Sequence, residues 1–155
     1  MVKIVIVESE GDALRIARTL FREYAVELDA DLCFQSFDDE LEDPLKKYGP
    51  PHGALFLAYY HNEVAGCIAL QPLNEGVCEM KRLYVRHDFR KHGVGRELVE
   101  KLINEAKAKG YSKMVLDTLE RLQAAIQLYQ MNGFNHTSAY YANPLPGVVY
   151  MEREL

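Results

Sequence analysis

Residues 90–96 combine basic side chains with two glycines, a composition that suits an anionic ligand. The basic members are Arg90, Lys91, His92 and Arg96, and the glycines are Gly93 and Gly95. A helix that begins at Gly93 would leave its first backbone N–H groups unpaired and carry positive partial charge there, so it would attract phosphate. Without side chains, the glycines would let a pyrophosphate approach these N–H groups closely. The segment therefore predicts a phosphate-binding turn, although a purely structural β–α turn would share some of these residues.

Two nucleotide-binding motifs fit this segment poorly. The chain contains no G-x-x-x-x-G-K-[ST] sequence, which argues against a P-loop. A dinucleotide-binding turn needs G-x-G-x-x-G directly after a strand, but Leu98 replaces the third glycine and seven residues separate Val85 from Gly93. Asp117, about twenty residues further on, superficially resembles the acid that binds ribose in that motif. The length of the loop and Leu98 still disfavour a dinucleotide site.

Two motifs in the second half of the chain resemble the hallmarks of the GNAT acyltransferase superfamily. Residues Arg90 to Gly95 match the family signature R/Q-x-x-G-x-G/A. Residues 125–134 read A-x-x-L-Y-x-x-x-G-F, which resembles the second hallmark, a helix that ends in Y-x-x-x-G-F. The motifs occur at the right separation and within a matching order of elements, which makes the resemblance specific. It covers nearly all of the chain and is strongest from Glu79 to Phe134.

This resemblance implies that acetyl-CoA is the acyl donor and that an amine is the acceptor. The backbone of residues 90–96 would hold the pyrophosphate, and Leu83 and Val85 would bind pantetheine through main-chain groups. In the family, the strand that holds Leu83 splays from the next parallel strand, and a bulge leaves an N–H group free to polarise the thioester carbonyl. Leu122 departs from the family, since many members carry there an asparagine that contacts the cofactor. The residues expected to bind acetyl-CoA are Leu83, Tyr84, Val85, Arg90, Lys91, His92, Gly93, Val94, Gly95 and Arg96.

Acylation of an amine requires two proton transfers, and the resemblance suggests a residue for each. The attacking ammonium, with a free pKa of about 10, must lose a proton, and the leaving thiolate benefits from gaining one. Tyr129 is the candidate general acid, because the family places this tyrosine beside the thioester sulfur; the alternative is a tyrosine that packs in the core. Glu79 is the candidate general base, directly or through water, because strand periodicity places it on the same face as Lys81 and Leu83. The alternative is a carboxylate paired with a neighbouring Lys or Arg.

Residues outside the acetyl-CoA site are expected to select the acceptor. In the family, the segment between the first two helices and the C-terminal strands line the acceptor side; here these are residues 29–40 and 140–144. Asp38 and Glu40 in the first segment suggest a small cationic amine. The alternative is a set of ordinary core aromatics followed by an Asn-Pro turn. The candidate substrate-binding residues are Phe34, Phe37, Tyr140, Tyr141 and Asn143.

The elements expected to position these residues follow the order β-α-α-β-β-β-α-β-α-β-β. Apolar residues at three- and four-residue steps favour the helices, and apolar or β-branched runs between turn residues favour the strands. This order predicts an α/β (mixed α+β) fold: a GNAT-like central mixed β-sheet of about seven strands flanked by about four helices, in a single domain of residues 1–155. The expected strands are residues 2–8, 54–60, 63–70, 76–86, 113–118, 134–140 and 148–154. The expected helices are residues 11–28, 37–47, 93–109 and 121–131.

Composition and charge limit the classes of function. The chain has 155 residues, 48% of them hydrophobic, and its longest apolar run is far shorter than the ~20 residues of a membrane span. A net charge of −5 argues against general nucleic-acid binding. Residues 27–43 hold eight acidic and no basic residues, whereas residues 81–113 hold ten basic and four acidic ones. These segments could serve a cationic substrate and an anionic cofactor, or they could simply form two solvated faces.

The cysteines suggest a reducing compartment. Cys33, Cys67 and Cys78 form an odd set without C-x-x-C spacing, so they are expected to be small core residues. With no recognisable leader sequence, the protein is predicted to be cytoplasmic. No histidine has ligand spacing, so no metal is expected. No cysteine lies within either motif, so the amine is expected to attack the thioester directly.

A second class of function stays open at this stage. The chain could be an acetyl-CoA sensor or regulatory module that retains the phosphate-binding turn without turnover. Leu122 favours this alternative slightly, whereas the retained Tyr129 and Glu79 oppose it. The expected partner is a small-molecule amine, and a homodimer through the C-terminal strands is an open alternative, because family members are often dimers.

Overall fold

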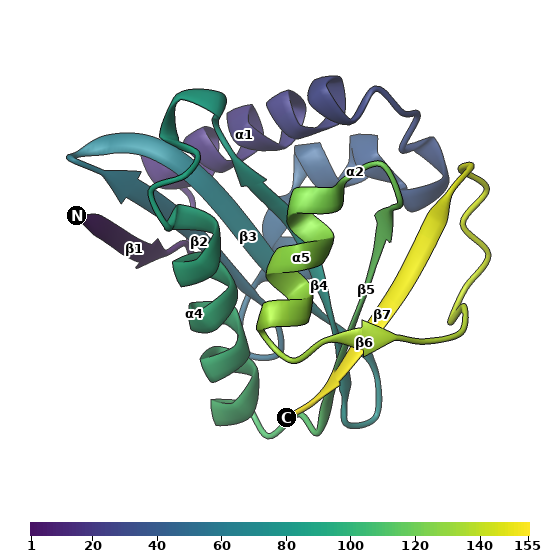
Figure 1. The fold of residues 1–155 in the computed structure, drawn as a ribbon. Helices are drawn as coiled ribbons and strands as arrows, with labels where there is room; N and C mark the ends of the chain where they lie inside the picture. The colour runs from purple at the N-terminus through teal and green to yellow at the C-terminus, as the bar shows by residue number, and fades with distance from the viewer.

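The computed structural model describes all residues from 1 to 155. One sheet contains seven strands in the order β1-β2-β3-β4-β5-β7-β6 (Figure 1). Only β4 and β5 run parallel, and the other neighbours are antiparallel. The strands are β1 (Val2–Ile6), β2 (Ala54–Tyr60), β3 (Glu63–Asn74), β4 (Val77–Val85), β5 (Lys113–Leu119), β6 (Asn135–His136) and β7 (Val148–Glu154).

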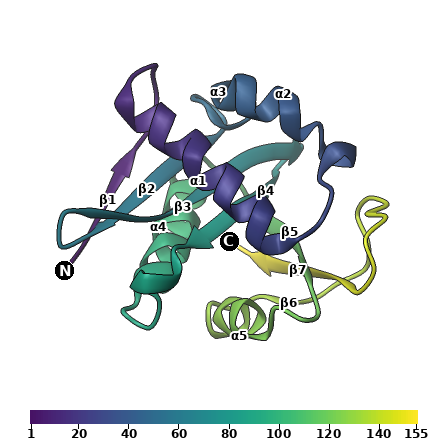
Figure 2. The same ribbon diagram turned by 90° about the horizontal axis from the view of Figure 1, so that it is seen from above.

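Helices cover both faces of this sheet (Figure 2). The helices are α1 (Asp12–Leu28), α2 (Phe37–Glu42), α3 (Pro44–Tyr48), α4 (Val94–Ala108) and α5 (Gln123–Met131), with short 3₁₀ helices η1 (Cys33–Gln35) and η2 (His87–Phe89). On one face, Phe21 of α1 and Tyr48 of α3 pack with Leu57 of β2. On the other face, Leu98 of α4 and Ile126 of α5 share a second hydrophobic cluster. Each amphipathic helix thus buries its apolar stripe against the sheet.

The predicted fold class and the order of the strands are confirmed, with five α-helices rather than about four. The extra helix arises because residues 37–47, predicted as one helix, form α2 and α3 with a break at Asp43. A proline disfavours the helical conformation of the residue before it. Asp43, which precedes Pro44, accordingly has φ −141° and ψ 83°.

Some predicted boundaries are wrong. The strand expected at residues 134–140 is reduced to β6, because the chain then leaves the sheet and Tyr140 and Tyr141 bond to side chains of β4 and β5. The first strand ends at Ile6, and α5 begins at Gln123 rather than at residue 121. Two cysteines are buried as expected, but Cys33 is exposed in η1 and does not belong to the core.

An irregularity in β4 shapes the centre of the sheet. β3 pairs Cys67 with Tyr84 and Ala69 with Lys81, so two residues of β4 lie opposite one residue of β3. Arg82, within this bulge, has a φ of 61°, in the left-handed region. Gly66 is required opposite the bulge, because a Cβ atom there would lie 2.3 Å from the carbonyl oxygen of Tyr84. The bulge expected from the family resemblance is therefore present.

The two parallel strands diverge beside this bulge. β4 and β5 pair only through Val77–Lys113, Cys78–Met114 and Glu79–Val115. Beyond Glu79 they no longer hydrogen-bond to each other, so the sheet splits at its middle. The expected splay is confirmed, and the split is the place where a ligand can enter between two strands.

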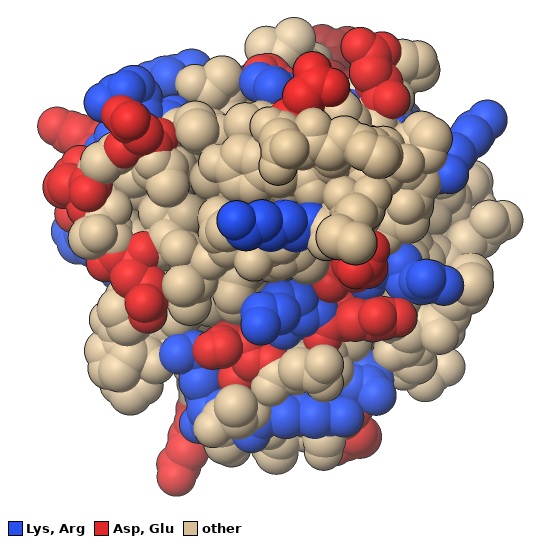
Figure 3. Space-filling model, turned by 90° about the vertical axis from the view of Figure 1, so that its left-hand side faces the viewer, with Lys and Arg blue, Asp and Glu red and all other residues tan.

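Charged side chains are mixed on the side of the molecule where the chain begins. Figure 3 shows that basic and acidic groups are interspersed on this face rather than collected into a patch of one sign. Such a face offers no continuous basic track for a nucleic-acid backbone. None of the helices has the length and apolar character that crossing a membrane would require.

Candidate active site

The phosphate-binding turn predicted at residues 90–96 joins η2 to α4. Gly93 has a φ of 81°, and α4 begins directly after it. The amide of Glu97 donates to the carbonyl oxygen of Gly93 at 3.1 Å as the first bond of the helix. The N–H groups just before Glu97 therefore have no partner within the helix and carry its positive partial charge. The sequence folds this way because a glycine adopts the left-handed conformation at little cost.

The basic side chains of this turn have different roles. The Nε atom of Arg90 donates to the carbonyl oxygen of Val85 at 2.9 Å, and its guanidinium forms an ion pair with Glu27. Arg90 therefore fastens the turn to β4 and α1. His92 stacks on Tyr60, with 4.8 Å between the ring centroids. Lys91 and Arg96 are exposed beside the amides, and Arg96 forms an exposed ion pair with Glu100 at 3.8 Å.

A groove of about 540 Å³ runs from this turn along β4 and α5. Leu83, Tyr84 and Val85 of β4 line one wall, and Val94 and Gly95 line the end at the turn. A Cβ atom at Gly95 would lie 3.2 Å from Leu128 on the opposite wall, so a side chain there would narrow the groove. An elongated, largely apolar ligand with phosphates at one end fits this shape.

The groove adjoins a cavity of about 70 Å³ at the split between β4 and β5. The two spaces share the lining residues Tyr24, Leu83, Leu122 and Ala125. Leu122, the departure from the family pattern, thus contributes an apolar surface where the groove meets the cavity. Tyr129 also lines the cavity, and burial raises the pKa of its hydroxyl above the ordinary value. Tyr129 is therefore protonated at neutral pH, as a general acid must be.

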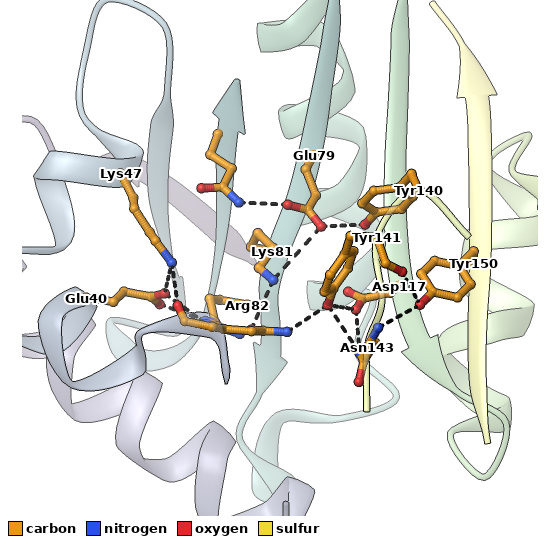
Figure 4. A network of polar contacts seen from close by, with 12 residues as sticks. Glu40, Lys47, Glu79, Lys81, Arg82, Asp117, Tyr140, Tyr141, Asn143 and Tyr150 are labelled. Atoms are coloured by element: carbon orange, nitrogen blue, oxygen red, sulfur yellow. Dashed lines mark hydrogen bonds and ion pairs between the residues drawn. The ribbon is translucent and has the colours of Figure 1, made fainter. Parts of the chain in front are cut away.

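Glu79 lies beside this cavity rather than in its lining. The carboxylate accepts hydrogen bonds from Gln71 Nε2 at 2.7 Å and from the hydroxyl of Tyr140 (Figure 4). Its Oε2 atom is 4.0 Å from Lys81 Nζ, and Lys81 does line the cavity. Glu79 thus lies next to the expected acyl site and is paired with a lysine, and its role as general base stays a prediction.

The bulge changes which side chains share a face of β4. Cys78 and Met80 pack in the cluster beneath α4 and α5, so Glu79 points to the opposite face, beside Lys81. Leu83 packs against the α4–α5 cluster instead. The expectation that Glu79 and Leu83 share a face is therefore wrong, because the extra residue at Arg82 reverses the alternation.

Three of the five candidate substrate-binding residues lie together above the split. Asn143 Nδ2 donates to Asp117 at 2.7 Å, and the hydroxyl of Tyr141 also bonds to Asp117 (Figure 4). Gln35 Nε2 donates to the hydroxyl of Tyr141 at 3.1 Å and links the segment before α2 to this loop. Tyr140 bonds to Glu79, as described above. The loop thus covers the carboxylates of both diverging strands.

The other two candidates pack elsewhere. The ring of Phe37 lies 5.2 Å from the guanidinium carbon of Arg82, and Phe34 packs against Leu28, Leu32 and Leu119. The expectation that Glu40 attracts a cationic substrate is wrong. It is buried and forms two hydrogen bonds with Arg82, at 2.7 and 2.9 Å. Asp38 remains exposed.

The sequence analysis missed several residues that the structure brings to this site. Lys81 was noted only as a neighbour of Glu79, although three charged residues, Glu79, Lys81 and Arg82, within one strand are a signal that could have been used. Asp117 was considered only as a ribose-binding acid, yet it lines the cavity at the point where β5 leaves β4. Gln35 carries no signal in the sequence, because its contacts come from residues far along the chain.

Comparison with known proteins agrees with this architecture. Residues 16–134 match the Acetyltransferase (GNAT) family. An uncharacterized N-acetyltransferase of Schizosaccharomyces pombe is 48% identical over 140 residues, which cover 89% of this chain and 86% of that protein. A second, from Dictyostelium discoideum, is 31% identical and covers 93% of this chain and 94% of its own length. The crystal structure of a GNAT family acetyltransferase from Elizabethkingia anophelis with acetyl-CoA bound has a TM-score of 0.71 at 27% identity, covering 99% of this chain and 98% of that one. The chain therefore belongs to the acetyltransferase (GNAT) family and is, as predicted, an acyltransferase enzyme.

Proposed function

We propose that the protein transfers the acetyl group of acetyl-CoA to a primary amine of a small molecule by direct attack. The observation that carries this proposal is an apolar groove along β4 that adjoins a cavity at the split. The groove has the free amides of α4 at one end, and the adjoining cavity is lined by Tyr129 and lies beside Glu79.

The donor is acetyl-CoA, and each of its parts has a suitable surface. The amides of residues 91–96, with Lys91 and Arg96, would hold the pyrophosphate. The apolar walls around Leu83 and Val85 would hold pantetheine, and the cavity at the split would receive the thioester. One main-chain acceptor of this strand, the carbonyl oxygen of Val85, already accepts from Arg90. Pantetheine would therefore bond to β4 chiefly through its other main-chain groups.

The chemistry requires two protons to leave the ammonium and one to reach the sulfur. Glu79, directly or through water, accepts the proton of the attacking ammonium. The neutral nitrogen then forms a bond to the carbonyl carbon, and the C–S bond breaks. The nitrogen loses its second proton as the amide forms, and Tyr129 passes a proton to the leaving thiolate and regains one from the nitrogen through water. The unpaired residue of the bulge at Arg82 places a backbone amide near the split, where it can polarise the carbonyl.

An acyl-enzyme intermediate has no suitable nucleophile. Burial raises the pKa of the Cys67 thiol and raises that of Cys78 to about 12, so neither is a thiolate at neutral pH. Cys33 is exposed in η1, outside the groove and the cavity at the split. Direct attack by the amine is the mechanism that these positions favour.

The acceptor would enter from the side covered by residues 140–143. Tyr140, Tyr141 and Asn143 would then contact the substrate, whereas Phe34 and Phe37 would support the loop from beneath. We place the enzyme in the cytoplasm as one domain, since its buried thiols suit a reducing compartment. A homodimer through the C-terminal strands belongs to the same proposal.

Acetyl-CoA binding and turnover test the proposal in two steps. A rise in melting temperature with added acetyl-CoA is expected, because a ligand that binds only the folded state stabilises it. Release of CoA thiol is then measured across a panel of small primary amines, for the wild type and for Tyr129→Phe. The variant should keep the acetyl-CoA-dependent rise but lose turnover by about 10²-fold or more. A rise without turnover of any amine would favour the sensor alternative, and no rise at all would refute the donor site.

A further inference from the structure

We propose that Lys81 is itself an acceptor: without an amine substrate, its Nζ atom takes the acetyl group from acetyl-CoA bound to the same chain. This inference rests on the proposed function, because it requires the thioester in the cavity at the split. Direct attack by an external amine assigns no role to Lys81. The structure nevertheless places this amine where an acceptor amine would have to react.

The position of Lys81 is the first part of the argument. It lies on β4 directly before the bulge, and it is the one lysine that lines the cavity shared with Tyr129 and Leu83. Its side chain is only 6% exposed. Figure 4 shows it beside Glu79, on the same side of β4. An ammonium group held in this place is close to the proposed base and within the space proposed for the thioester.

The bonding of Lys81 is the second part. Its Nζ atom donates one hydrogen bond, to Gln35 Oε1 at 3.1 Å, and lies 4.0 Å from Glu79 Oε2. An ammonium has three N–H groups, so these contacts leave the side chain incompletely held. Burial, with the nearby Arg82 guanidinium, lowers the pKa of Lys81 below its ordinary value, although Glu79 and Asp117 oppose the shift. A larger fraction of this amine is therefore neutral than of an exposed lysine.

The step balances without any further reagent. Lys81 gives one proton to Glu79, and its lone pair forms a C–N bond with the thioester carbonyl carbon. The C–S bond breaks, the nitrogen loses its second proton, and the thiolate gains one through Tyr129. Glu79 later releases its proton to solvent. The products are N-acetyl-lysine, CoA thiol and one proton, with no change in oxidation state.

Acetylation of Lys81 would lower the activity of the enzyme. It removes the positive charge beside Glu79 and places a neutral acetyl group in a cavity of about 70 Å³. The modified chain would have less room for a thioester and an acceptor. Lys81 would therefore mark chains that have held acetyl-CoA without an amine, and it would lower their turnover.

The test follows isotope-labelled acetyl-CoA into the full-length wild-type chain in the absence of any amine. Peptide mass spectrometry compares the rate of acetylation at Lys81 with that at Lys107, an exposed lysine of α4. We expect Lys81 to react at least about tenfold faster, with a first-order rate that is independent of protein concentration. In Tyr129→Phe the rate at Lys81 should fall about tenfold or more, whereas that at Lys107 should stay unchanged.

Acetyl phosphate provides the matched control, because it acetylates exposed amines without using the CoA groove. With this reagent the order should reverse, and Lys107 should react faster than the buried Lys81. If acetyl-CoA raises the melting temperature but labels Lys81 no faster than Lys107, the inference is wrong and the proposed function stands. If acetyl-CoA does not raise the melting temperature, both the inference about Lys81 and the proposed function are wrong.

Discussion

Replacing Glu40 with glutamine should destabilise the fold and loosen the bulge. The Glu40 side chain is fully buried, and it holds the Arg82 guanidinium through bonds of 2.7 and 2.9 Å. Lys47 adds a third contact at 3.2 Å. Glutamine keeps the shape but removes the charge, so Arg82 becomes a buried cation without a counter-ion. Removing one partner of a buried ion pair costs about 3–5 kcal/mol, and we expect about 3 because the amide oxygen can still accept one bond.

Urea unfolding followed by circular dichroism measures this loss. With a slope of about 2 kcal/mol per molar urea, 3 kcal/mol lowers the midpoint by about 1.5 M. The control is Asp39→Asn, an exposed acid on the same helix, which should hardly move the midpoint. Turnover of Glu40→Gln, measured well below its midpoint, should also fall, since Arg82 holds the φ of 61° that forms the bulge. Equal midpoints for the two variants would refute the argument.

The pH dependence gives a second check on the same pair. Burial raises the pKa of Glu40, but the hydrogen bonds and charge of Arg82, with the charge of Lys47, outweigh burial and leave the pKa below its ordinary value. A group whose folded pKa is lowered contributes stability above its unfolded pKa, about 4.3, and loses it as the pH falls through the folded value. The difference between wild type and Glu40→Gln should therefore be constant near neutral pH and shrink below about pH 4. A difference that grows in acid would contradict this assignment.

Three further substitutions test the parts of the site separately. Glu79→Gln removes the proposed base and should lower kcat/KM by about 10²-fold or more, while acetyl-CoA still raises the melting temperature; unchanged turnover would exclude Glu79 as the base. Gly95→Ala places a methyl group in the groove, 3.2 Å from the end of the Leu128 side chain, so acetyl-CoA affinity by calorimetry should fall while the unliganded melting temperature does not. Asn143→Ala breaks the bonds to Asp117 and to the amide of Leu145, so the KM for the amine should rise more than the KM for acetyl-CoA; equal changes in both would count against a role in the acceptor site.

The features predicted well from the sequence are those encoded by neighbouring residues. The turn before α4 needs only the glycines and basic residues of one short segment, and α4 itself follows from its apolar period. The register of β4 was harder to predict, because the bulge depends on how β3 pairs with β4. Its effect was to move Leu83 to the other face. Such a shift leaves no mark on the local alternation of side chains.

The side-chain partners on the acceptor side escaped prediction for a related reason. Glu40 and Arg82 are 42 positions apart, and Gln35 and Tyr141 are 106 apart. Their partners are set by packing α1 and α2 over the sheet and by folding the C-terminal loop across the split. Charge runs in the sequence suggested that Glu40 faces a substrate. In the fold, the charge of Glu40 instead neutralises a buried arginine. Composition alone cannot distinguish a carboxylate that faces a substrate from one that pairs with a buried arginine.

The contacts of the C-terminal loop bear on how an acceptor is recognised. Tyr140 donates to Glu79, and Tyr141 and Asn143 donate to Asp117, so each carboxylate beside the split already has a neutral donor. Glu79 is buried and Asp117 half-buried, and a carboxylate removed from water without donors is costly, so these bonds stabilise the loop over both strands. A primary ammonium that replaced a tyrosine hydroxyl as donor would add a positive charge, so it would bind these carboxylates more strongly than the neutral hydroxyl does. A neutral alcohol offers no such advantage over the tyrosine that it must displace. If the proposed function is right, this network would also favour amines over hydroxyl compounds as acceptors.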